Sequence, residues 1–429
     1  MKEIEIKNLK GTEDFPPQKQ LLRNRIIGIL RENFENYGYQ PLETPILNSF
    51  DLLKYKYEDG AEILNEIYKF KDQGDRDIGL RFDLTVPFCK FIALNKDMAM
   101  PFRRYEIGKV FRDGPVKLGR AREFYQCDVD VVGIDGRYIE AEQMLMVKDI
   151  FTKLDIDIEI RWNNRKLMVG IFKFLNIDDD KIDSCIGLID RLDKISKEEL
   201  YTEFDKLGVS KTVVDYMLEI FAKGLNELTE KFKDSNIEIL QEGIAECNEL
   251  ENILNLLGLK DVSVFYPRLA RGQNIYTSTV FEFFDKQKRI TSSLGGGGRY
   301  NKIITNFVNN GQNYPAVGLT FGLEPIYAIL KQDQQEANAS VLIIPMGTEV
   351  ECLKIAQTLR DNNIKTICEL GGRKVKKAFD YANKCNIKYV VVIGSEEIES
   401  NLFTIKDMAS SNQQKVNLQE LIDILKNNQ

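Results

Sequence analysis

The chain has 429 residues, which is enough for two or three domains, and with 43% hydrophobic and 29% charged residues it has the composition of a water-soluble globular protein. It contains no histidine, and this excludes Ser-His-Asp and Cys-His catalysis, imidazole metal ligands and a histidine general base. A net charge of −7 argues against indiscriminate nucleic-acid binding but still permits a local basic patch.

The cysteines and the chain start indicate where the protein works. The seven cysteines are scattered and never spaced CxxC, which is typical of a reduced cytoplasmic protein without a structural zinc site. The N-terminus is charged from its first residues and lacks a secretory core. No apolar run approaches the roughly 20 residues of a membrane helix. We therefore expect a cytoplasmic protein that makes no use of a membrane.

The first part of the chain predicts a helix followed by an antiparallel sheet. Residues 18–36 have apolar side chains at helical spacing, and Pro41 and Pro45 keep the next stretch extended. Short polar turns join the following strand-like runs, which favours antiparallel pairing. These runs are IYKFKD (67–72), GLRFDLTVP (79–87), FRRYEIGKVF (102–111) and EFYQCDVDVVG (123–133). A second helix is expected over residues 138–154.

The texture changes in the middle of the chain. Residues 167–260 are rich in Leu, Ile, Lys and Glu at helical spacing, so we interpret them as a helical insertion. Residues 262–285 again have a pattern typical of strands, and residues 316–332 predict a strand that continues into a helix. Residues 331–339 are polar and without pattern, and they are the predicted linker.

After the linker, nearly continuous apolar strands alternate with amphipathic helices over residues 340–429. This rhythm predicts a small α/β domain with a buried, mostly parallel sheet. Four basic residues form the one obvious patch for a local nucleic-acid contact, and for each of them a solvated helix face is the better interpretation; they are Arg373, Lys374, Lys376 and Lys377.

Polar side chains recur at every second position in two of the predicted strands. Alternation along a strand puts Gln126, Asp128 and Asp130 on one face, with Tyr125, Cys127, Val129 and Val131 on the other. By the same rule Arg81, Asp83 and Thr85 share a face. These residues alone favour an ordinary solvated face of an antiparallel sheet over a binding site.

Arginines and glycines add a second kind of signal. Arg112 and Arg120 flank a loop, where guanidinium groups could hold a phosphate or carboxylate, although surface charge on a turn explains them equally well. Arg271 stands at the head of an apolar predicted strand, where an unpaired charge is costly. GGGGRY (295–300) permits close backbone approach but fits neither the P-loop nor GxGxxG, so by itself it predicts a flexible turn.

Taken together, these stretches resemble the histidyl-tRNA synthetases, a family of class II aminoacyl-tRNA synthetases. The resemblance follows the family's order over almost the whole chain, through KGTEDFPP (10–17), GYQPLETPIL (38–47), RFDLTVP (81–87), VFRDGPVKLGRAREFYQCDVDVVG (110–133), LARGQNIYTSTVFE (269–282), GGGGRYNKI (295–303), AVGLTFGLEPI (316–326) and GRKVKKAFDYANKCNIKYVVVIG (372–394).

The resemblance implies an α+β fold. An antiparallel-sheet catalytic domain would span residues 1–166 and 261–330, interrupted by the helical insertion at 167–260. After the linker at 331–339, residues 340–429 would form an α/β anticodon-binding domain. The family's enzymes are homodimers, and the resemblance implies that the Pro45 region lies at the interface.

The implied activity is ligation of histidine to tRNA. L-Histidine would be activated with ATP, in the presence of Mg²⁺, to histidyl-adenylate and transferred to the 3′-end of tRNA(His). Arg112 would bind the α-phosphate and Arg120 would lie near the nucleotide, with Arg112 and Arg271 as the catalytic pair. The resemblance implies a histidine pocket formed by Asp83, Thr85, Gln126, Asp130, Arg271 and Tyr276, with Tyr300 closing it around the imidazole.

The chain also departs from the family's pattern. Pro325 stands where motif 3 normally has the arginine that holds the ATP γ-phosphate, and proline has no donor to offer. Another cation, for which Lys117, Arg120 and Arg299 are the candidates, would have to replace it. An alternative function is that of a histidine-sensing regulatory subunit of the kind that works with ATP phosphoribosyltransferase. A third is a paralogue that binds tRNA or an amino-acid analogue for another purpose.

Overall fold

A computed structural model describes residues 5–55, 62–116, 121–192, 195–271, 275–331 and 337–427. The chain divides into two compact units. The first holds residues 1–13 and 26–329, and the second holds residues 14–25 and 330–429. Of the predicted linker, residues 332–336 lie outside the described residues, and the predicted domain boundaries stay predictions.

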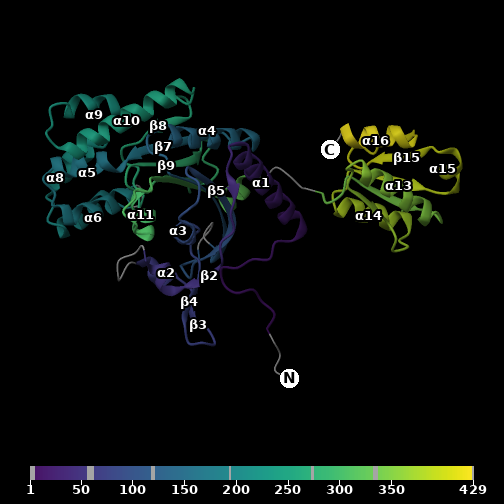
Figure 1. Cartoon of the computed structure of the whole chain (residues 1–429). Helices are drawn as coiled ribbons and strands as arrows, with labels where there is room; N and C mark the ends of the chain where they lie inside the picture. The colour runs from purple at the N-terminus through teal and green to yellow at the C-terminus, as the bar shows by residue number, and fades with distance from the viewer. Residues whose placement is uncertain are drawn as a thin grey trace. The chain divides into compact units, whose positions relative to one another are not determined.

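The first unit is built on an eight-stranded sheet (Figure 1). Its strand order is β1-β5-β6-β11-β10-β9-β7-β8. In that order the strands are β1 (Gln40–Pro41), β5 (Phe102–Phe111), β6 (Glu123–Val132), β11 (Ala316–Gly322), β10 (Gly295–Arg299), β9 (Thr279–Asp285), β7 (Ile158–Asn164) and β8 (Ser263–Phe265). Among the strand pairs that the structure describes in this sheet, only the outermost, β1–β5 and β7–β8, are parallel. The predicted antiparallel sheet is therefore confirmed for its centre.

Helices cover both faces of the sheet. The helices α1 (Pro17–Asn36) and α4 (Tyr138–Lys153) pack on its apolar face, whereas α3 (Thr85–Leu94) and α11 (Asn301–Val308) pack on the face that carries Asp130, around Val132 and Ala316. The helix α12 (Leu323–Leu330) follows β11 directly. Aromatic rings join helix to strand: the centroid of Phe151 on α4 lies 5.5 Å from that of Phe283 and 6.1 Å from that of Phe321. Offset ring pairs at such distances stabilise a core beyond their buried area. The sheet's other face carries polar residues beside the cluster that α3 and α11 form on it.

The predicted strand over residues 79–87 is wrong in its second half. Strand β4 (Asp77–Leu80) ends before it. This strand pairs with β2 (Leu47–Ser49) and β3 (Lys69–Lys71) in a separate small sheet. The same part of the chain contains α2 (Phe50–Lys54) and a 3₁₀ turn, η1 (Glu62–Glu66). Thr85 opens α3, and Asp83 accepts a hydrogen bond from the Val86 N–H at 3.0 Å. A helix start thus replaces the expected alternation, so Asp83 and Thr85 do not share a strand face.

The central glycines form a strand. Gly295 to Arg299 make β10, which is hydrogen-bonded to β9 on one side and β11 on the other. The expectation of a flexible turn was wrong. The missing side chains leave space for the side chains of neighbouring strands and do not allow the chain to reverse.

In the described parts of residues 165–262, six helices lie between β7 and β8, as expected for the insertion. They are α5 (Arg165–Phe174), α6 (Asp179–Asp190), α7 (Lys197–Lys206), α8 (Lys211–Ile220), α9 (Leu225–Phe232) and α10 (Glu238–Leu256), and most of them gather beside β7, β8 and β9 in Figure 1. A Cβ on Gly243 would stand 2.3 Å from the Leu167 backbone nitrogen, so α10 and α5 pack backbone against backbone. Among the described residues, no helix is long and apolar enough to cross a membrane.

The second unit carries a five-stranded sheet of order β13-β12-β14-β15-β16. Its strands are β12 (Val341–Pro345), β13 (Thr366–Cys368), β14 (Tyr389–Ile393), β15 (Phe403–Asp407) and β16 (Gln413–Val416). Its helices are α13 (Glu349–Asp361), α14 (Val375–Lys384), α15 (Ser395–Ser400) and α16 (Leu418–Asn427). The first three strands are parallel and the last two antiparallel, so the sheet is mixed rather than mostly parallel.

Candidate active site

The polar face of the large sheet holds a pocket that gathers side chains from distant parts of the sequence. Eight of the nine residues named by the resemblance line it: Asp83, Thr85, Arg112, Gln126, Asp130, Arg271, Tyr276 and Tyr300. The ninth, Arg120, lies outside the described residues, as does Lys117. Two polar residues that the resemblance did not name, Asp128 and Thr320, line the same pocket.

Strand β6 supplies one wall of the pocket by the predicted alternation. Gln126, Asp128 and Asp130 face the pocket, and the alternate residues Cys127 and Val129 are buried in the core. The acids are not solvated, however, because only 5% of Asp128 and 4% of Asp130 is exposed. The interpretation as an ordinary solvated face was therefore wrong.

Glycines on neighbouring strands make room for these charges. Gly318 on β11 pairs with Asp130, and a Cβ at 318 would stand 1.9 Å from Asp130 Oδ1. A Cβ on Gly296 of β10 would stand 2.2 Å from Arg271 Nη1. Such contacts are far inside van der Waals distance, so both positions require glycine if the charged groups are to stay where they are.

Arg271 lies between β8 and β9 rather than at the head of a strand, which corrects the predicted position. Its Nη1 is 3.1 Å from Glu282 Oε1, and its guanidinium carbon lies 5.4 Å from the centre of the Tyr276 ring. The expectation that a charge here would be paired is met by Glu282. The pocket therefore has a cation at one rim that is held by a carboxylate and an aromatic face.

A buried ion-pair layer lies beneath the acids. Arg104 is fully buried on β5, with Nη2 2.6 Å from Asp130 Oδ2 and its guanidinium carbon 4.3 Å from the centre of the Phe88 ring. Next to it, Glu106 Oε1 accepts a hydrogen bond from Arg81 Nη1 at 2.7 Å. Sequence reasoning missed this layer, although the alternation of Arg104 and Glu106 in FRRYEIGKVF is the same signal that marked β6.

The pKa values of the acids follow from burial. Burial raises the pKa of Asp128 to about 7; the charge of Arg104 opposes the shift, and the neighbouring charge of Asp130 adds to it. Burial also raises the pKa of Asp130, against the pull of Arg104 and of the Tyr300 hydroxyl, which donates to Asp130 Oδ1. The pocket thus holds one carboxyl group, that of Asp128, with a pKa near neutral pH, beside a second whose pKa is also raised.

The remaining predicted residues lie near the start of α3. Arg112 Nε donates to the Phe82 carbonyl oxygen at 3.1 Å, and its guanidinium carbon lies 5.1 Å from the centre of the Phe124 ring. Asp83 and Thr85 are positioned by the first turn of the helix. Arg112 is only partly buried, so its guanidinium remains accessible to an anionic ligand.

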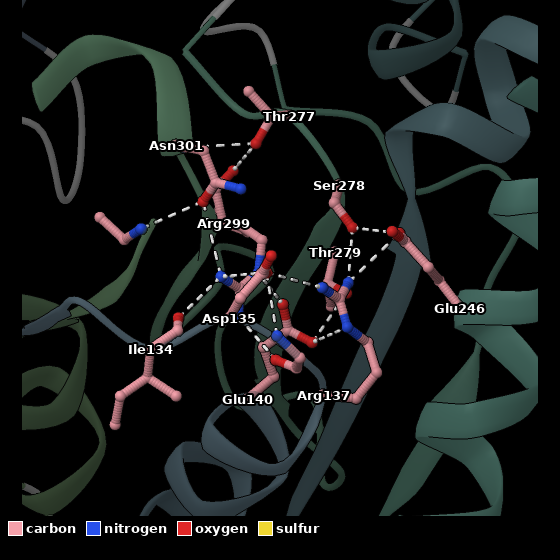
Figure 2. A network of polar contacts seen from close by, with 12 residues as sticks. Ile134, Asp135, Arg137, Glu140, Glu246, Thr277, Ser278, Thr279, Arg299 and Asn301 are labelled. Atoms are coloured by element: carbon pink, nitrogen blue, oxygen red, sulfur yellow. Dashed lines mark hydrogen bonds and ion pairs between the residues drawn. The ribbon is translucent and has the colours of Figure 1, made fainter. Parts of the chain in front are cut away.

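Arg299 does not face the pocket. It is 1% exposed, and Figure 2 shows it enclosed by residues of the sheet and of α4. Its Nε is 2.7 Å from Glu140 Oε1, while its amino groups donate to the carbonyl oxygens of Ile134 and Gly136 at 3.1 and 2.6 Å. Arg299 is therefore removed from the candidates for a γ-phosphate clamp.

The network in Figure 2 continues to the helical insertion. Arg137 bridges two acids, with Nε 3.2 Å from Glu140 Oε2 and Nη1 3.2 Å from Glu246 Oε2 on α10. Glu246 also accepts a hydrogen bond from the Ser278 hydroxyl. Polar contacts thus join the insertion to Ser278, which directly precedes β9 and lies two residues beyond the pocket residue Tyr276.

Comparison with known proteins identifies the family. The model of the family described as "Histidyl-tRNA synthetase" matches residues 11–326. The chain belongs to the histidyl-tRNA synthetase family. A second model, described as "Anticodon binding domain", matches residues 340–428. Histidine–tRNA ligase 1 of Bacillus cereus is 44% identical over 421 residues, covering 97% of this chain and 99% of the relative.

Solved structures agree with this family. Histidyl-tRNA synthetase from Nostoc sp. PCC 7120 superposes with a TM-score of 0.88 at 28% identity over 100% of both chains. An ATP phosphoribosyltransferase regulatory subunit/histidyl-tRNA synthetase from Bacillus halodurans has a TM-score of 0.77 at 18% identity, over 92% of this chain and 100% of the other. The latter likeness shows the fold alone. The predicted family and the class II synthetase fold are thus confirmed.

The structure shows where one departure from the family's pattern, Pro325, lies. Pro325 is the third residue of α12, directly after the strand that carries Gly318 and Thr320. The place of the missing arginine is thus in the first turn of a helix, where proline is well tolerated because the N–H it lacks would have no partner within the helix.

Proposed function

We propose that this protein activates L-histidine with ATP to histidyl-adenylate and transfers the histidyl group to the 3′-end of tRNA(His). The observation that carries the proposal is the pocket itself. It joins buried carboxylates, two tyrosines and the arginines Arg112 and Arg271 in one site. Acids suit an ammonium and an imidazole, and guanidinium groups suit a carboxylate and a phosphate.

In the proposed roles, Asp83, Thr85 and Gln126 take the amino-acid end of the substrate. Asp130, Tyr276 and Tyr300 enclose its side chain. The hydrogen bond from the Tyr300 hydroxyl to Asp130 supports this arrangement, since it fixes the ring at the wall of the pocket. Arg112 and Arg271 face the carboxylate and the α-phosphate, where negative charge builds up.

The first step needs no general base. A carboxylate oxygen of histidine attacks the α-phosphorus of ATP, an acyl–phosphate bond forms, and pyrophosphate leaves with the electron pair of the broken P–O bond. Catalysis then consists of alignment and stabilisation of charge on the phosphoryl oxygens. This agrees with a chain that contains no histidine.

In the second step the terminal ribose hydroxyl of tRNA attacks the acyl carbon of the adenylate. An ester bond forms and AMP leaves, while the hydroxyl proton passes to a phosphate oxygen of the adenylate. The substrate supplies the base in this scheme. The protein's part is again position and charge, through the same arginines.

Mg²⁺ would enter as part of the nucleotide substrate. This ion usually keeps several waters and binds through phosphates and one or two carboxylates rather than through an all-protein cage. Among the residues that the structure describes, no group of three His, Cys, Asp or Glu could hold a metal. A magnesium ion carried by ATP phosphates needs no such group.

The assembly and location that we propose follow the family. Two copies would associate through the region of Pro45, where Ile46 and Leu47 are 41% and 54% exposed. The C-terminal unit would bind the anticodon, with the exposed basic patch at the start of α14 as a contact. All seven cysteines are free thiols, which suits work in the cytoplasm.

Histidine-dependent exchange of pyrophosphate into ATP tests the proposal. The purified protein is expected to catalyse exchange with histidine and with no other amino acid, and to charge tRNA(His). Arg271→Ala should reduce the rate by roughly 100-fold or more, as expected when a group that stabilises transition-state charge is lost. No exchange at high ATP, with Arg271→Ala indistinguishable from the parent, would reject the proposal.

The regulatory alternative makes a different prediction. A histidine sensor would bind histidine without exchange and would co-purify with a phosphoribosyltransferase catalytic chain. The match of residues 340–428 to an anticodon-binding domain favours charging, since a sensor of histidine has no use for such a domain.

A further inference from the structure

The three residues that follow the pocket residue Tyr276 (277–279) all carry hydroxyl groups. The first of them, Thr277, donates to the Arg299 carbonyl oxygen through its N–H at 2.8 Å and through its hydroxyl at 3.3 Å. The same hydroxyl accepts a hydrogen bond from the Asn301 N–H at 3.3 Å. The backbone and the side chain of this residue are therefore both bound to the end of β10 and the start of α11, next to Tyr276.

The helical insertion holds the middle hydroxyl residue, Ser278, at two atoms. The Ser278 carbonyl oxygen accepts a hydrogen bond at 2.9 Å from the N–H of Arg165, the first residue of α5. The Ser278 hydroxyl donates to the carboxylate of Glu246 on α10, as Figure 2 shows. Ser278 is only 2% exposed, so bulk water does not replace a partner that is lost. The position of this residue therefore depends on where the insertion packs.

Arg137 joins the insertion to α4 at the same point. It directly precedes α4, is 3% exposed and is not one of the described residues that line the pocket. Its Nη1 donates to the hydroxyls of Ser278 at 2.6 Å and Thr279 at 3.2 Å, and the same atom lies 3.2 Å from Glu246 Oε2. Its Nε lies 3.2 Å from Glu140 Oε2. Because guanidinium donors lie in one rigid plane, this single side chain fixes α4, the start of β9 and α10 relative to one another.

Tyr276 has little freedom to absorb a shift of this segment, since it is only 9% exposed. Its ring lies against the backbone of β10, where a Cβ on Gly298 would stand 2.8 Å from Tyr276 Cδ1. The guanidinium carbon of Arg271 lies 5.4 Å from the centre of the ring. Tyr276 and Ser278 are two residues apart, which is about 7 Å along an extended chain. A displacement of Ser278 is therefore carried to the ring and to the wall of the pocket.

We propose that Arg137 is a positioning residue for histidine binding, which holds Ser278 between α4 and the insertion and thereby sets the ring of Tyr276 at the pocket. The inference rests on the proposed function and deepens it, because Tyr276 there encloses the side chain of the substrate. Arg137 acts only through this segment. The pocket thus has its full affinity for histidine only when the insertion is packed against the start of β9.

The variant Arg137→Met tests this, because it keeps the length of the side chain and removes every donor. In pyrophosphate exchange its KM for histidine should rise roughly 10-fold while kcat and the KM for ATP stay within about twofold, since the ring contacts the amino acid alike in the ground state and the transition state. An unchanged KM for histidine would overturn the proposal.

Arg103→Met is the matched control. It breaks another ion pair between an arginine and α4, with Glu142, but Arg103 lies on β5, and three strands separate β5 from β9. This variant should change none of the three constants. A rise in the KM for histidine as large as that of Arg137→Met would mean that any loosening of α4 has this effect, and it would overturn the proposal.

A double-mutant cycle separates positioning from a general loss of structure. In the background Tyr276→Ala the ring is gone, so Arg137→Met should change the KM for histidine by less than about twofold. A general weakening of the fold would act in both backgrounds. Equal factors in the two backgrounds would therefore overturn the proposal.

Ser278→Ala makes the same test with a smaller change. It deletes the hydroxyl through which Arg137 and Glu246 hold the segment, and it leaves these two charges paired at 3.2 Å. Loss of the hydrogen bonds to this hydroxyl should raise the KM for histidine about three- to tenfold in the parent and less than about twofold in Tyr276→Ala. No rise in the parent would overturn the proposal even if Arg137→Met does not fold.

Calorimetric titration of histidine without ATP makes the result independent of catalysis. The dissociation constant should rise by the same factors in the same variants, and again only where Tyr276 is present. If these factors appear in a protein that shows no pyrophosphate exchange, the proposed function fails and the role of Arg137 stands. If exchange is normal and histidine binds equally well to Arg137→Met and Ser278→Ala, the proposed function stands and this role is refuted.

Discussion

Arg299 offers a direct test of whether the GGGGRY stretch (295–300) serves the fold or the nucleotide. Arg299→Lys keeps the positive charge next to Glu140 but replaces a planar fork with a single ammonium. The guanidinium now bonds Glu140, the Ile134 carbonyl and the Gly136 carbonyl in three directions. A lysine ammonium at this depth can keep its contact with Glu140, but it must lose at least the hydrogen bonds to the two carbonyl oxygens.

The cost follows from these lost bonds. A buried acceptor left without its donor costs about 1–1.5 kcal/mol, so two carbonyls predict a loss of about 2–3 kcal/mol in the free energy of unfolding. Arg289→Lys is the control: Arg289 contacts Asp285 at 2.9 Å, but its side chain is 25% exposed, so the change should cost less than about 1 kcal/mol.

The chain's single tryptophan makes the measurement specific to the first unit. Trp162 on β7 is 2% exposed, so its fluorescence during urea unfolding reports the eight-stranded sheet and is silent about the second unit. This matters because two units with separate sheets need not unfold in one step. For Arg299→Lys, a loss below about 0.5 kcal/mol in the free energy of unfolding would refute a buried structural role of Arg299. A tenfold rise in the KM for ATP without any loss of stability would refute it as well.

Three further outcomes are expected. Gly318→Ala should raise the KM for histidine at least about tenfold, because its Cβ displaces the opposing carboxylate, whereas Gly187→Ala, with open space around it, should leave the KM unchanged. Without histidine, the parent should lose up to about 4 kcal/mol in the free energy of unfolding relative to Asp128→Asn as the pH rises from 4 through 7. The reason is that the Asp128 carboxyl keeps its proton up to a pKa of about 7 in the folded state and releases it near pH 4 in the unfolded state. A difference in urea unfolding that stays constant with pH would contradict this. Glu246→Gln should speed amide hydrogen exchange around Ser278, with a loss of about 1–3 kcal/mol, and unchanged exchange would dismiss the network as a brace.

Local periodicity predicted the parts of the site that depend on one strand. The alternation of Gln126, Asp128 and Asp130 survives in β6, because the period of two is a property of the extended backbone. Which distant stretches meet around it was supplied by resemblance to a family and by no local pattern. The eight pocket residues that the structure describes come together as that resemblance implied.

The wrong predictions share one cause: a local sequence pattern does not show which residues other helices and strands will bury. Asp83 and Thr85 read as strand positions, although Pro87 in the first turn and an acid ahead of it are signals of a helix start. Arg104 could have been found by applying the alternation rule to β5 as well as to β6. The mixed order of the second unit's sheet could not, because strand order is set by packing between segments far apart in sequence.

The glycines beside the charged groups bear on how such a protein can lose its activity. Gly108, Gly296 and Gly318 each leave the space that one charged side chain occupies, those of Arg81, Arg271 and Asp130 respectively. At positions 296 and 318 an added methyl group would displace a charged atom that lines the pocket. A screen for inactive alleles should therefore recover changes at positions with no reactive group of their own, and their products should still accumulate in the cell as folded protein.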